Sequence, residues 1–204
     1  MTIFFSNEFK EKNFLKILTY KKNIILDFGC GLGVWNKKKL SNKIHKIFLY
    51  DKNKEVVSLT KKNYKKCKKI FFINKKHFFN KKKFFKKNKV NIILMNSVIQ
   101  YINRNDLKNL ILMFEKCVSE KKYKIIITDI PIYSRFIEIF LLLFFNFSRF
   151  VDAIKLIFNF SYHKTLFYKN NIDMKFIEKK FAIKKCENLN NFIFRKTLIL
   201  TKND

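Results

Sequence analysis

Glycine and proline are scarce in this chain, whose 204 residues include three glycines and one proline. The four cysteines are scattered, with no CxxC pair and no histidine at ligand spacing, so neither a zinc site nor a disulfide framework is indicated. The longest apolar run, Ile139–Phe145, is far shorter than the roughly 20 residues that span a bilayer. The N-terminus also lacks the apolar core of a signal peptide. These absences favour a cytoplasmic protein with reduced cysteines and no stable insertion into a membrane.

Acidic residues are few as well. Lys and Arg number 45 against 15 Asp and Glu, which gives a formal net charge of +30. Such a charge is typical of proteins that bind nucleic acid or acidic membranes. The chain is, however, rich in Lys, Asn, Ile and Phe, as proteins encoded by AT-rich sequences are, and the basic residues include only four arginines. Lysine drift at exposed positions is therefore the favoured explanation of the charge, and a partner is not required.

All three glycines lie within five positions of one stretch, LDFGCGLG at 26–33. The apolar run that precedes them, NIILDF at 23–28, predicts a buried parallel strand. Glycine permits positive φ and has no Cβ, so a ligand can approach the main chain and the N–H groups of a helix predicted over 34–40. In an open parallel sheet this turn lies at the carboxyl edge of the strands, where ligands bind. The stretch therefore predicts a site for a nucleotide-like cofactor.

The remaining chain alternates strand and helix, which predicts an α/β fold with a mostly parallel sheet and a C-terminal antiparallel hairpin. One domain covering 1–204 is expected. The apolar, aromatic segment 133–167 fits no element of the sheet and is predicted to be helical. The predicted strands are 23–28, 43–50, 69–73, 89–95, 124–128 and two within 181–200. The predicted helices are 7–19, 34–40, 53–66, 106–118 and 171–179.

The spacing of glycines and acids indicates which cofactor fits. A dinucleotide fingerprint requires G-x-G-x-x-G, whereas here the glycines are followed by Val34. Asp27 precedes the first glycine by two positions, where a cationic group would be favoured. Asp51 ends the second predicted strand about 20 residues after the loop, the position from which a carboxylate accepts hydrogen bonds from ribose hydroxyls. These features suit adenosine that carries an amino acid in place of phosphates.

At these residues the sequence resembles the class I S-adenosylmethionine-dependent methyltransferases. The segments that carry the resemblance are ILDFGCGLG (25–33), LYD (49–51), NIILMNSVIQYI (91–102) and KIIITDIP (124–131). It implies a three-layer Rossmann-like fold with a seven-stranded sheet, and it implies S-adenosylmethionine as the cofactor. The residues that it assigns to cofactor binding are Asp27, Gly29, Cys30, Gly31, Gly33, Asp51, Asn96 and Ser97. One departure is Asn74, which stands where the family often has an acid that contacts adenine.

The methyl acceptor is narrowed mainly by what the motifs lack. The segment MNSV at 95–98 lacks the Pro-Pro-aromatic motif of amino-directed nucleic-acid methyltransferases, and no Pro-Cys pair is present. A catechol-type metal site would need a carboxylate where Asn96 stands, so no metal is expected. A metal-independent enzyme that methylates oxygen of a small molecule or saccharide remains, with 133–167 as a helical lid over the acceptor. A general base is optional, and the candidates at the carboxyl edge are Asp129, Tyr133, Tyr162 and His163. His163 is selected because a neutral imidazole can take a proton from a hydroxyl group near pH 7, although a packing or surface role is the favoured explanation of this histidine.

Two other functions stay open at this point. The segment KKHFFNKKKFFKKNK (75–89) interleaves lysines with phenylalanines, as surfaces that bind single-stranded nucleic acid do, so RNA is an alternative acceptor. The segment IEIFLLLFFNF (137–147), with basic residues around it, could dock on a membrane surface. A cofactor motif is not expected in a purely structural protein. The acceptor's identity and the oligomeric state are left open by the sequence.

Overall fold

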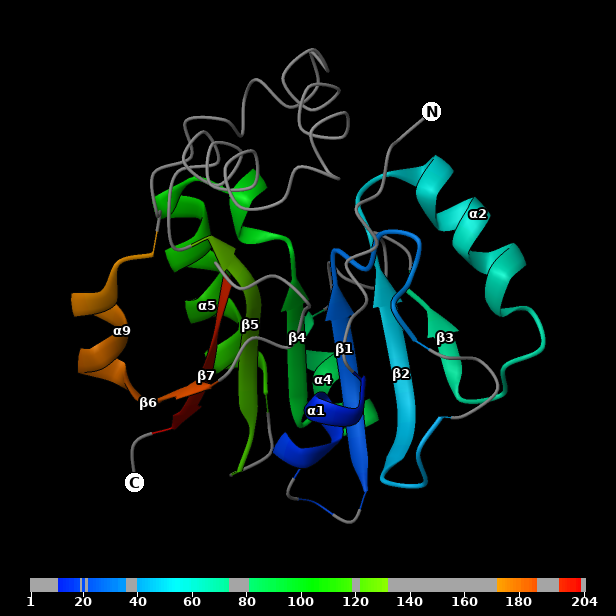
Figure 1. Cartoon of the computed structure of the whole chain (residues 1–204), viewed down its shortest axis with the longest axis horizontal. Helices are drawn as coiled ribbons and strands as arrows, with labels where there is room; N and C mark the ends of the chain where they lie inside the picture. The colour runs from blue at the N-terminus through cyan, green and yellow to red at the C-terminus, as the bar shows by residue number, and fades with distance from the viewer. Residues whose placement is uncertain are drawn as a thin grey trace, which may run out of the picture.

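A computed structural model describes residues 11–18, 20, 22–35, 40–73, 81–118, 122–131, 172–186 and 195–202. These residues build a seven-stranded sheet in the order β3-β2-β1-β4-β5-β7-β6 (Figure 1). Strands β1 to β5 pair in parallel, whereas β7 is antiparallel to both β5 and β6. The predicted mostly parallel sheet with a C-terminal antiparallel hairpin is confirmed.

The strands match the predicted positions closely. They are β1 (Asn23–Phe28), β2 (Ile44–Tyr50), β3 (Ile70–Phe72), β4 (Ile92–Asn96), β5 (Lys124–Pro131), β6 (Phe181–Cys186) and β7 (Arg195–Lys202). The described helices are α1 (Glu11–Ile17), α2 (Lys54–Tyr64), α4 (Lys81–Asn88), the short 3-10 helix η1 (Ile99–Tyr101), α5 (Arg104–Cys117) and α9 (Met174–Lys180). Side chains of Asn53, Asn103 and Asp173 cap the N-termini of α2, α5 and α9.

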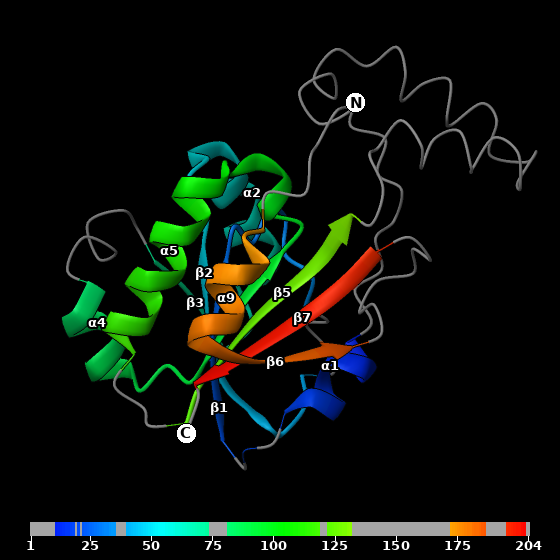
Figure 2. The same ribbon diagram turned by 90° about the vertical axis from the view of Figure 1, so that its left-hand side faces the viewer.

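Helices cover both faces of the sheet because its central strands are apolar on both sides. On β5, Ile125 and Ile127 pack in one core with side chains of α4, α5 and α9. Ile126, which points the other way, packs in a second core with α1 and α2. Figure 2 shows α4, α5 and α9 on one side of the sheet and α1 on the other. The arrangement has three layers and leaves the carboxyl ends of the parallel strands at one edge.

Three sequence predictions need correction. The helix predicted over 34–40 is absent at Val34, Trp35 and Leu40, while 36–39 lie outside the described residues. The stretch 81–88 was not predicted as helix but forms α4, because its two adjacent phenylalanines, Phe84 and Phe85, turn towards the core. Strand β5 was predicted to end at 128 and in fact continues to Pro131.

The continuation of β5 contains a bulge. Ile127 lies opposite Leu198 on β7 and Ile130 lies opposite Lys196, so three steps along β5 match two along β7. One extra residue on β5 therefore shifts the alternation, and Ile127 and Ile130 both face the same core. The proposed lid, 133–167, and His163 within it lie outside the described residues.

Candidate functional site

The three glycines form the turn that follows β1, and each has a positive φ: 73° at Gly29, 54° at Gly31 and 84° at Gly33. A Cβ on Gly29 would lie 2.6 Å from Val98 Cγ2, and one on Gly33 would lie 2.4 Å from the ring of Tyr64. A Cβ on Gly31 would meet no atom of the described residues within 4 Å. Packing thus requires glycine at the first and third positions, while the second borders open space.

The turn satisfies most of its own backbone donors. The amides of Gly29 and Cys30 donate to the Tyr50 carbonyl at 2.7 and 3.0 Å, and the Gly33 amide donates to the Cys30 carbonyl at 2.9 Å. Sequence reasoning expected the free N–H groups at the start of a helix over 34–40, and no helix forms at Val34, Trp35 or Leu40. The three amides of the turn are bonded within the protein. A turn with so few available donors is poorly suited to a pyrophosphate.

Asp51 connects the turn to the end of β2. Its Oδ2 accepts a hydrogen bond from the Gly31 amide at 3.0 Å, and its Oδ1 accepts one from the Asn53 amide at 2.9 Å. The side chain therefore fixes the backbone of the central glycine. Each carboxylate oxygen keeps a second lone pair, so the half-buried group can also accept hydrogen bonds from ribose hydroxyls.

Asp27 lies beneath the turn with only 1% of its surface exposed. Its Oδ2 accepts a hydrogen bond from Trp35 Nε1 at 2.8 Å, and no described residue donates to the buried Oδ1. Burial raises the pKa of Asp27 to about 7, the Trp35 bond lowers it, and the charge of Asp51 raises it. A cation bound at the turn would favour the ionised carboxylate. An ammonium or sulfonium group bound at the turn would thus stabilise the ionised carboxylate of Asp27.

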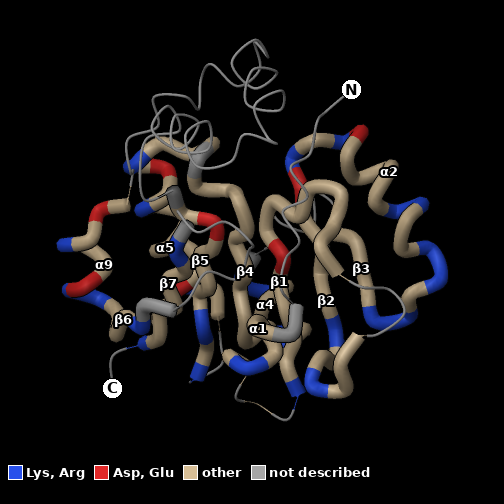
Figure 3. The backbone as a smooth tube through the Cα atoms, in the orientation of Figure 1, with Lys and Arg blue, Asp and Glu red and all other residues tan. Residues whose placement is uncertain are grey.

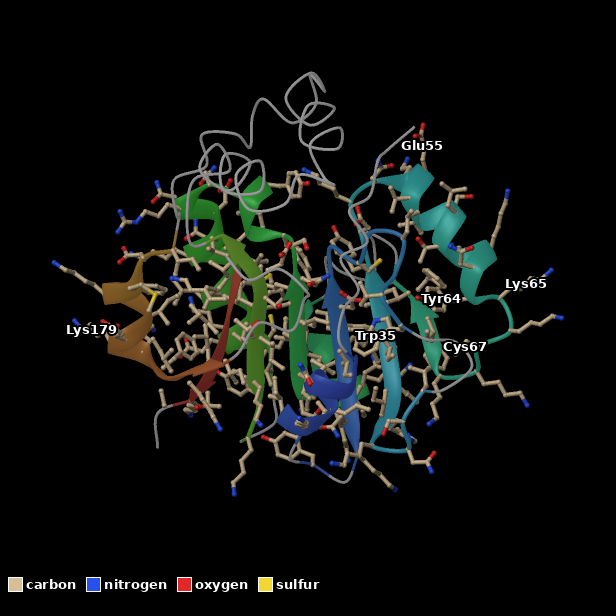
Figure 4. All side chains as sticks on the ribbon, in the orientation of Figure 1. Trp35, Glu55, Tyr64, Lys65, Cys67 and Lys179 are labelled. Carbon is tan, nitrogen blue, oxygen red and sulfur yellow. The ribbon has the colours of Figure 1, made fainter. Side chains whose placement is uncertain are left out.

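Side chains from α1 and α2 hold the turn in place. The Tyr64 hydroxyl donates to the Trp35 carbonyl at 2.9 Å and accepts from the Trp35 amide at 3.0 Å (Figure 4). The Thr60 hydroxyl lies 2.8 Å from the Gly31 carbonyl oxygen. Phe14 of α1 packs edge-on against Trp35, with ring centroids 5.4 Å apart. Sequence reasoning missed these residues, although the lone tryptophan of the chain, and Thr60 and Tyr64 four positions apart on a lysine-rich helix, were visible signals.

Strands β4 and β5 contribute the other part of this edge. Asn96 is the last residue of β4, and Ser97 follows it with φ 57°. The Ser97 hydroxyl donates to Asp129 Oδ2 at 2.5 Å. Because the next residue, Val98, packs directly against Gly29, the end of β4 adjoins the glycine turn. The structure therefore brings the sequence-predicted residues of β1, β2 and β4 to one edge of the sheet.

Several other side chains have limited chemical roles here. Cys30 is buried, and desolvation raises the pKa of its thiol, so the thiol remains protonated. Only the main chain of Cys30 is therefore a candidate for contact with a ligand. Within the described ranges no group of three or more His, Cys, Asp or Glu side chains could hold a metal ion. No helix among the same residues is long and apolar enough to cross a membrane.

Comparisons with known proteins agree with this geometry. The model of a family described as the methyltransferase small domain matches residues 11–118, more than half of the 204 residues. A Sulfolobus solfataricus protein described as a type 11 methyltransferase has a similar structure, with a TM-score of 0.61 and 16% identity over 98% of this chain and 95% of that one. The methyltransferase domain of bacterial CtHen1 gives 0.57 and 16% over 94% and 95%. The N-methyltransferase NodS of Bradyrhizobium japonicum gives 0.56 and 9% over 97% of both chains. No curated protein matches the chain by sequence.

Proposed function

Since this chain belongs to the methyltransferase small-domain family, and is an enzyme that uses S-adenosylmethionine, we propose that the glycine turn and the carboxyl ends of β1, β2 and β4 form its cofactor site. The cofactor supplies an electrophilic methyl group on a sulfonium. The proposed residues are Asp27, Gly29, Cys30, Gly31, Gly33, Asp51, Asn96 and Ser97. The observation that carries the proposal is the open space at Gly31, whose amide donates to the carboxylate of Asp51.

The residues present fit this cofactor by charge as well as by space. Asp27 is a buried carboxyl group that lacks one hydrogen-bond donor, and a positive charge nearby would stabilise its ionised form. Asp51 offers acceptor oxygens at the end of β2 without losing its hold on the turn. The turn itself offers few free N–H groups to phosphates. Together these features favour a cofactor with an amino-acid portion over a dinucleotide.

For the acceptor, a small-molecule or saccharide hydroxyl is the proposal best supported by the charges. The carboxylates Asp27, Asp51 and Asp129 lie at the carboxyl ends of β1, β2 and β5. Lysines and arginines are spread over the rest of the molecule, on the helices beside the carboxyl edge as well as where the parallel strands begin (Figure 3). The carboxylates at the strand ends can accept hydrogen bonds from the hydroxyl groups of a neutral acceptor. A nitrogen atom, as for the N-methyltransferase NodS, is the alternative acceptor. Chemical analysis of the methylated product distinguishes methylation of oxygen from methylation of nitrogen.

RNA as the acceptor loses most of its support in the described part of 75–89. Phe85 is fully buried, and Phe84 packs edge-on against Phe48 in the same core, so neither is available to stack on a base. The end of helix α4 leads into the start of β4. The five residues of β4 span about 17 Å between this point and the carboxyl edge of the sheet. The exposed Lys86 and Lys87 in the last turn of α4 are therefore remote from the proposed site.

Titration calorimetry tests the cofactor site directly. We expect S-adenosylmethionine and S-adenosylhomocysteine to bind the wild type with comparable affinity, because the turn and Asp51 contact parts common to both. Gly31→Asn should abolish binding of both, since its side chain fills the open space, and asparagine tolerates the left-handed backbone, so folding should persist. Binding of NAD without binding of S-adenosylmethionine would refute the assignment of the site.

A labelled-methyl assay tests the acceptor. Transfer from S-adenosylmethionine to a mixture of mono- and oligosaccharides, insensitive to added salt, is the expected result. Transfer to total RNA that collapses between low and physiological salt would instead identify a nucleic-acid acceptor. We also propose a cytoplasmic enzyme, which the free thiols of Cys30 and Cys67 support.

A further inference from the structure

Two residues with side chains adopt the left-handed backbone conformation at the carboxyl edge. Ser97 follows β4 with φ 57°, and Asp129 lies in β5 with φ 62°. Their side chains meet, because Ser97 Oγ donates to Asp129 Oδ2 at 2.5 Å. Non-glycine residues are rarely found in this region, and they persist where the surrounding structure imposes it, often at functional sites. Two such residues bonded to each other across neighbouring strands are not explained by chance turn geometry.

The bulge of β5 is what places Asp129. One extra residue between Ile127 and Ile130 interrupts the pairing with β7. Thr128 next to it is held by a buried hydrogen bond from Thr197 Oγ1 on β7, 3.0 Å long. Bulges of this kind redirect a side chain beside active sites. The carboxyl group of Asp129 is consequently buried, with 1% of the residue exposed, and directed at the residue that follows β4.

The pair lies on the side of the glycine turn opposite Asp51. In the sheet order, β2 flanks β1 on one side and β4 flanks it on the other. Asp51 belongs to the β2 side, whereas Val98, next to Ser97, packs against Gly29 from the β4 side. If ribose is held at Asp51 and the amino-acid portion at the turn, the space left for a methyl acceptor adjoins β4 and β5.

We propose that Ser97 is a catalytic residue that accepts a hydrogen bond from the acceptor's hydroxyl group, and that Asp129 is the positioning residue that orients it. This inference rests on the proposed function and deepens it. A serine hydroxyl that donates to a carboxylate turns its lone pairs away from that carboxylate. Ser97 Oγ is thereby fixed as an acceptor, made more basic by the negative charge of Asp129.

The chemistry balances without another reactant. The acceptor oxygen bonds to the methyl carbon, the sulfur–carbon bond breaks with its electron pair left on sulfur, the acceptor's proton passes to Ser97 Oγ, and the Ser97 proton passes to Asp129 Oδ2. Asp129 later releases that proton to solvent. The pair would thus perform the proton transfer for which sequence reasoning selected His163.

Binding of a cofactor analogue tests the proposal without a known acceptor. Sinefungin carries an ammonium group where S-adenosylmethionine carries its methyl, whereas S-adenosylhomocysteine carries nothing there. Affinities of both ligands are to be measured by calorimetry for the wild type, Asp129→Asn and Ser97→Gly. Asparagine and glycine both suit a left-handed backbone, so these variants should fold. Lys89→Gly is the matched control, because Lys89 is an exposed left-handed residue (φ 52°) before β4.

We expect the preference for sinefungin over S-adenosylhomocysteine to fall about tenfold in Asp129→Asn, since a charge-assisted hydrogen bond is lost. Affinity for S-adenosylhomocysteine should change less than twofold, and Lys89→Gly should match the wild type. An unchanged preference in both Asp129→Asn and Ser97→Gly would overturn the proposal while leaving the cofactor site intact. Failure of the wild type to bind either ligand would instead refute the proposed function.

With an acceptor identified, the rate supplies a second readout. Asp129→Asn should lower kcat with little change in KM, because the group that receives the proton is lost. Asp129→Glu should restore part of kcat. A role of Asp129 in folding alone would lower stability and leave kcat of the folded enzyme unaltered.

Discussion

The glycine turn after β1 and the carboxyl ends of β4 and β5 both require a left-handed backbone, but they use different residues for it. Both contain residues with positive φ. The turn uses glycine at all three positions, whereas the β4–β5 edge uses Ser97 and Asp129, and the exposed position before β4 uses Lys89. In this chain, positive φ is therefore not by itself a reason for glycine.

Space is the feature that separates the two regions. A Cβ would collide with Val98 at Gly29 and with Tyr64 at Gly33, so packing explains both glycines. Gly31 has no such neighbour, and its φ of 54° is close to that of the non-glycine residue Ser97, 57°. The atoms of the described residues thus do not account for glycine at position 31. The proposed cofactor, packed against the main chain in this space, would account for it.

The largest expected effect distinguishes the glycines within the turn. Gly33→Ala combines backbone strain with insertion of a methyl group into the Tyr64 ring, and the two costs together reach about 5 kcal/mol of unfolding free energy. Gly31→Ala should cost about 1 kcal/mol, from strain alone. Urea unfolding of the two variants measures the difference. Equal losses would show that the turn is packed differently from the structure.

The next largest effect concerns the charge beneath the turn. Burial raises the pKa of Asp27 from 3.8 to about 7, so the folded state keeps a proton that the unfolded state loses between these values. The unfolding free energy should fall as pH rises from about 4 to 7, by at most about 4 kcal/mol. Asp27→Asn, neutral throughout, should remove that fall and be the more stable protein at pH 8.

Cofactor binding should respond to the same carboxyl group with the opposite sign. A cation at the turn favours ionised Asp27, so affinity for S-adenosylmethionine should rise with pH towards 8, and binding near pH 6 should release a proton. Calorimetry in buffers of different ionisation enthalpy measures that release. In Asp27→Asn the affinity should be lower and independent of pH. A wild-type affinity that did not change between pH 6 and 8 would remove Asp27 from the site.

The strands and the glycine turn could be predicted from the sequence. Helix α4 and the bulge in β5 could not, for physical reasons. Apolar runs such as 23–28 mark buried strands wherever they pair, and glycines between two acids mark a ligand turn. The helix α4 was missed because a lysine-rich composition obscures its apolar face, which consists of Phe84 and Phe85. The bulge at Asp129 depends on the register with β7, which lies more than sixty residues away, and no local pattern encodes it.

A smaller effect tests the hydrogen bonds by which Tyr64 of α2 holds the glycine turn. Tyr64→Phe removes the hydroxyl that pairs with both backbone groups of Trp35, and the loss of these two buried hydrogen bonds should cost about 2 kcal/mol. Tyr123→Phe is the matched control, since no described residue bonds to its buried hydroxyl, and it should be neutral or stabilising. Thermal unfolding of both variants is the measurement. Similar values for the two would mean that the Tyr64 hydroxyl does not hold the turn.

The smallest expected effect compares the left-handed backbone at Ser97, beside the proposed site, with the left-handed backbone at the exposed Lys89. Lys89→Gly relieves the left-handed backbone at an exposed turn and should stabilise the protein by about 0.5 kcal/mol, after allowance for the greater freedom of glycine in the unfolded chain. Ser97→Gly gains the same relief but removes the hydroxyl that donates to the buried Asp129, which costs about 1 kcal/mol or more. Its net change should be zero or destabilising. Denaturant midpoints with a common m-value resolve this difference. If Ser97→Gly were stabilising by as much as Lys89→Gly, the hydrogen bond to Asp129 would contribute nothing to the fold, and the two left-handed residues would reflect only the scarcity of glycine in this chain.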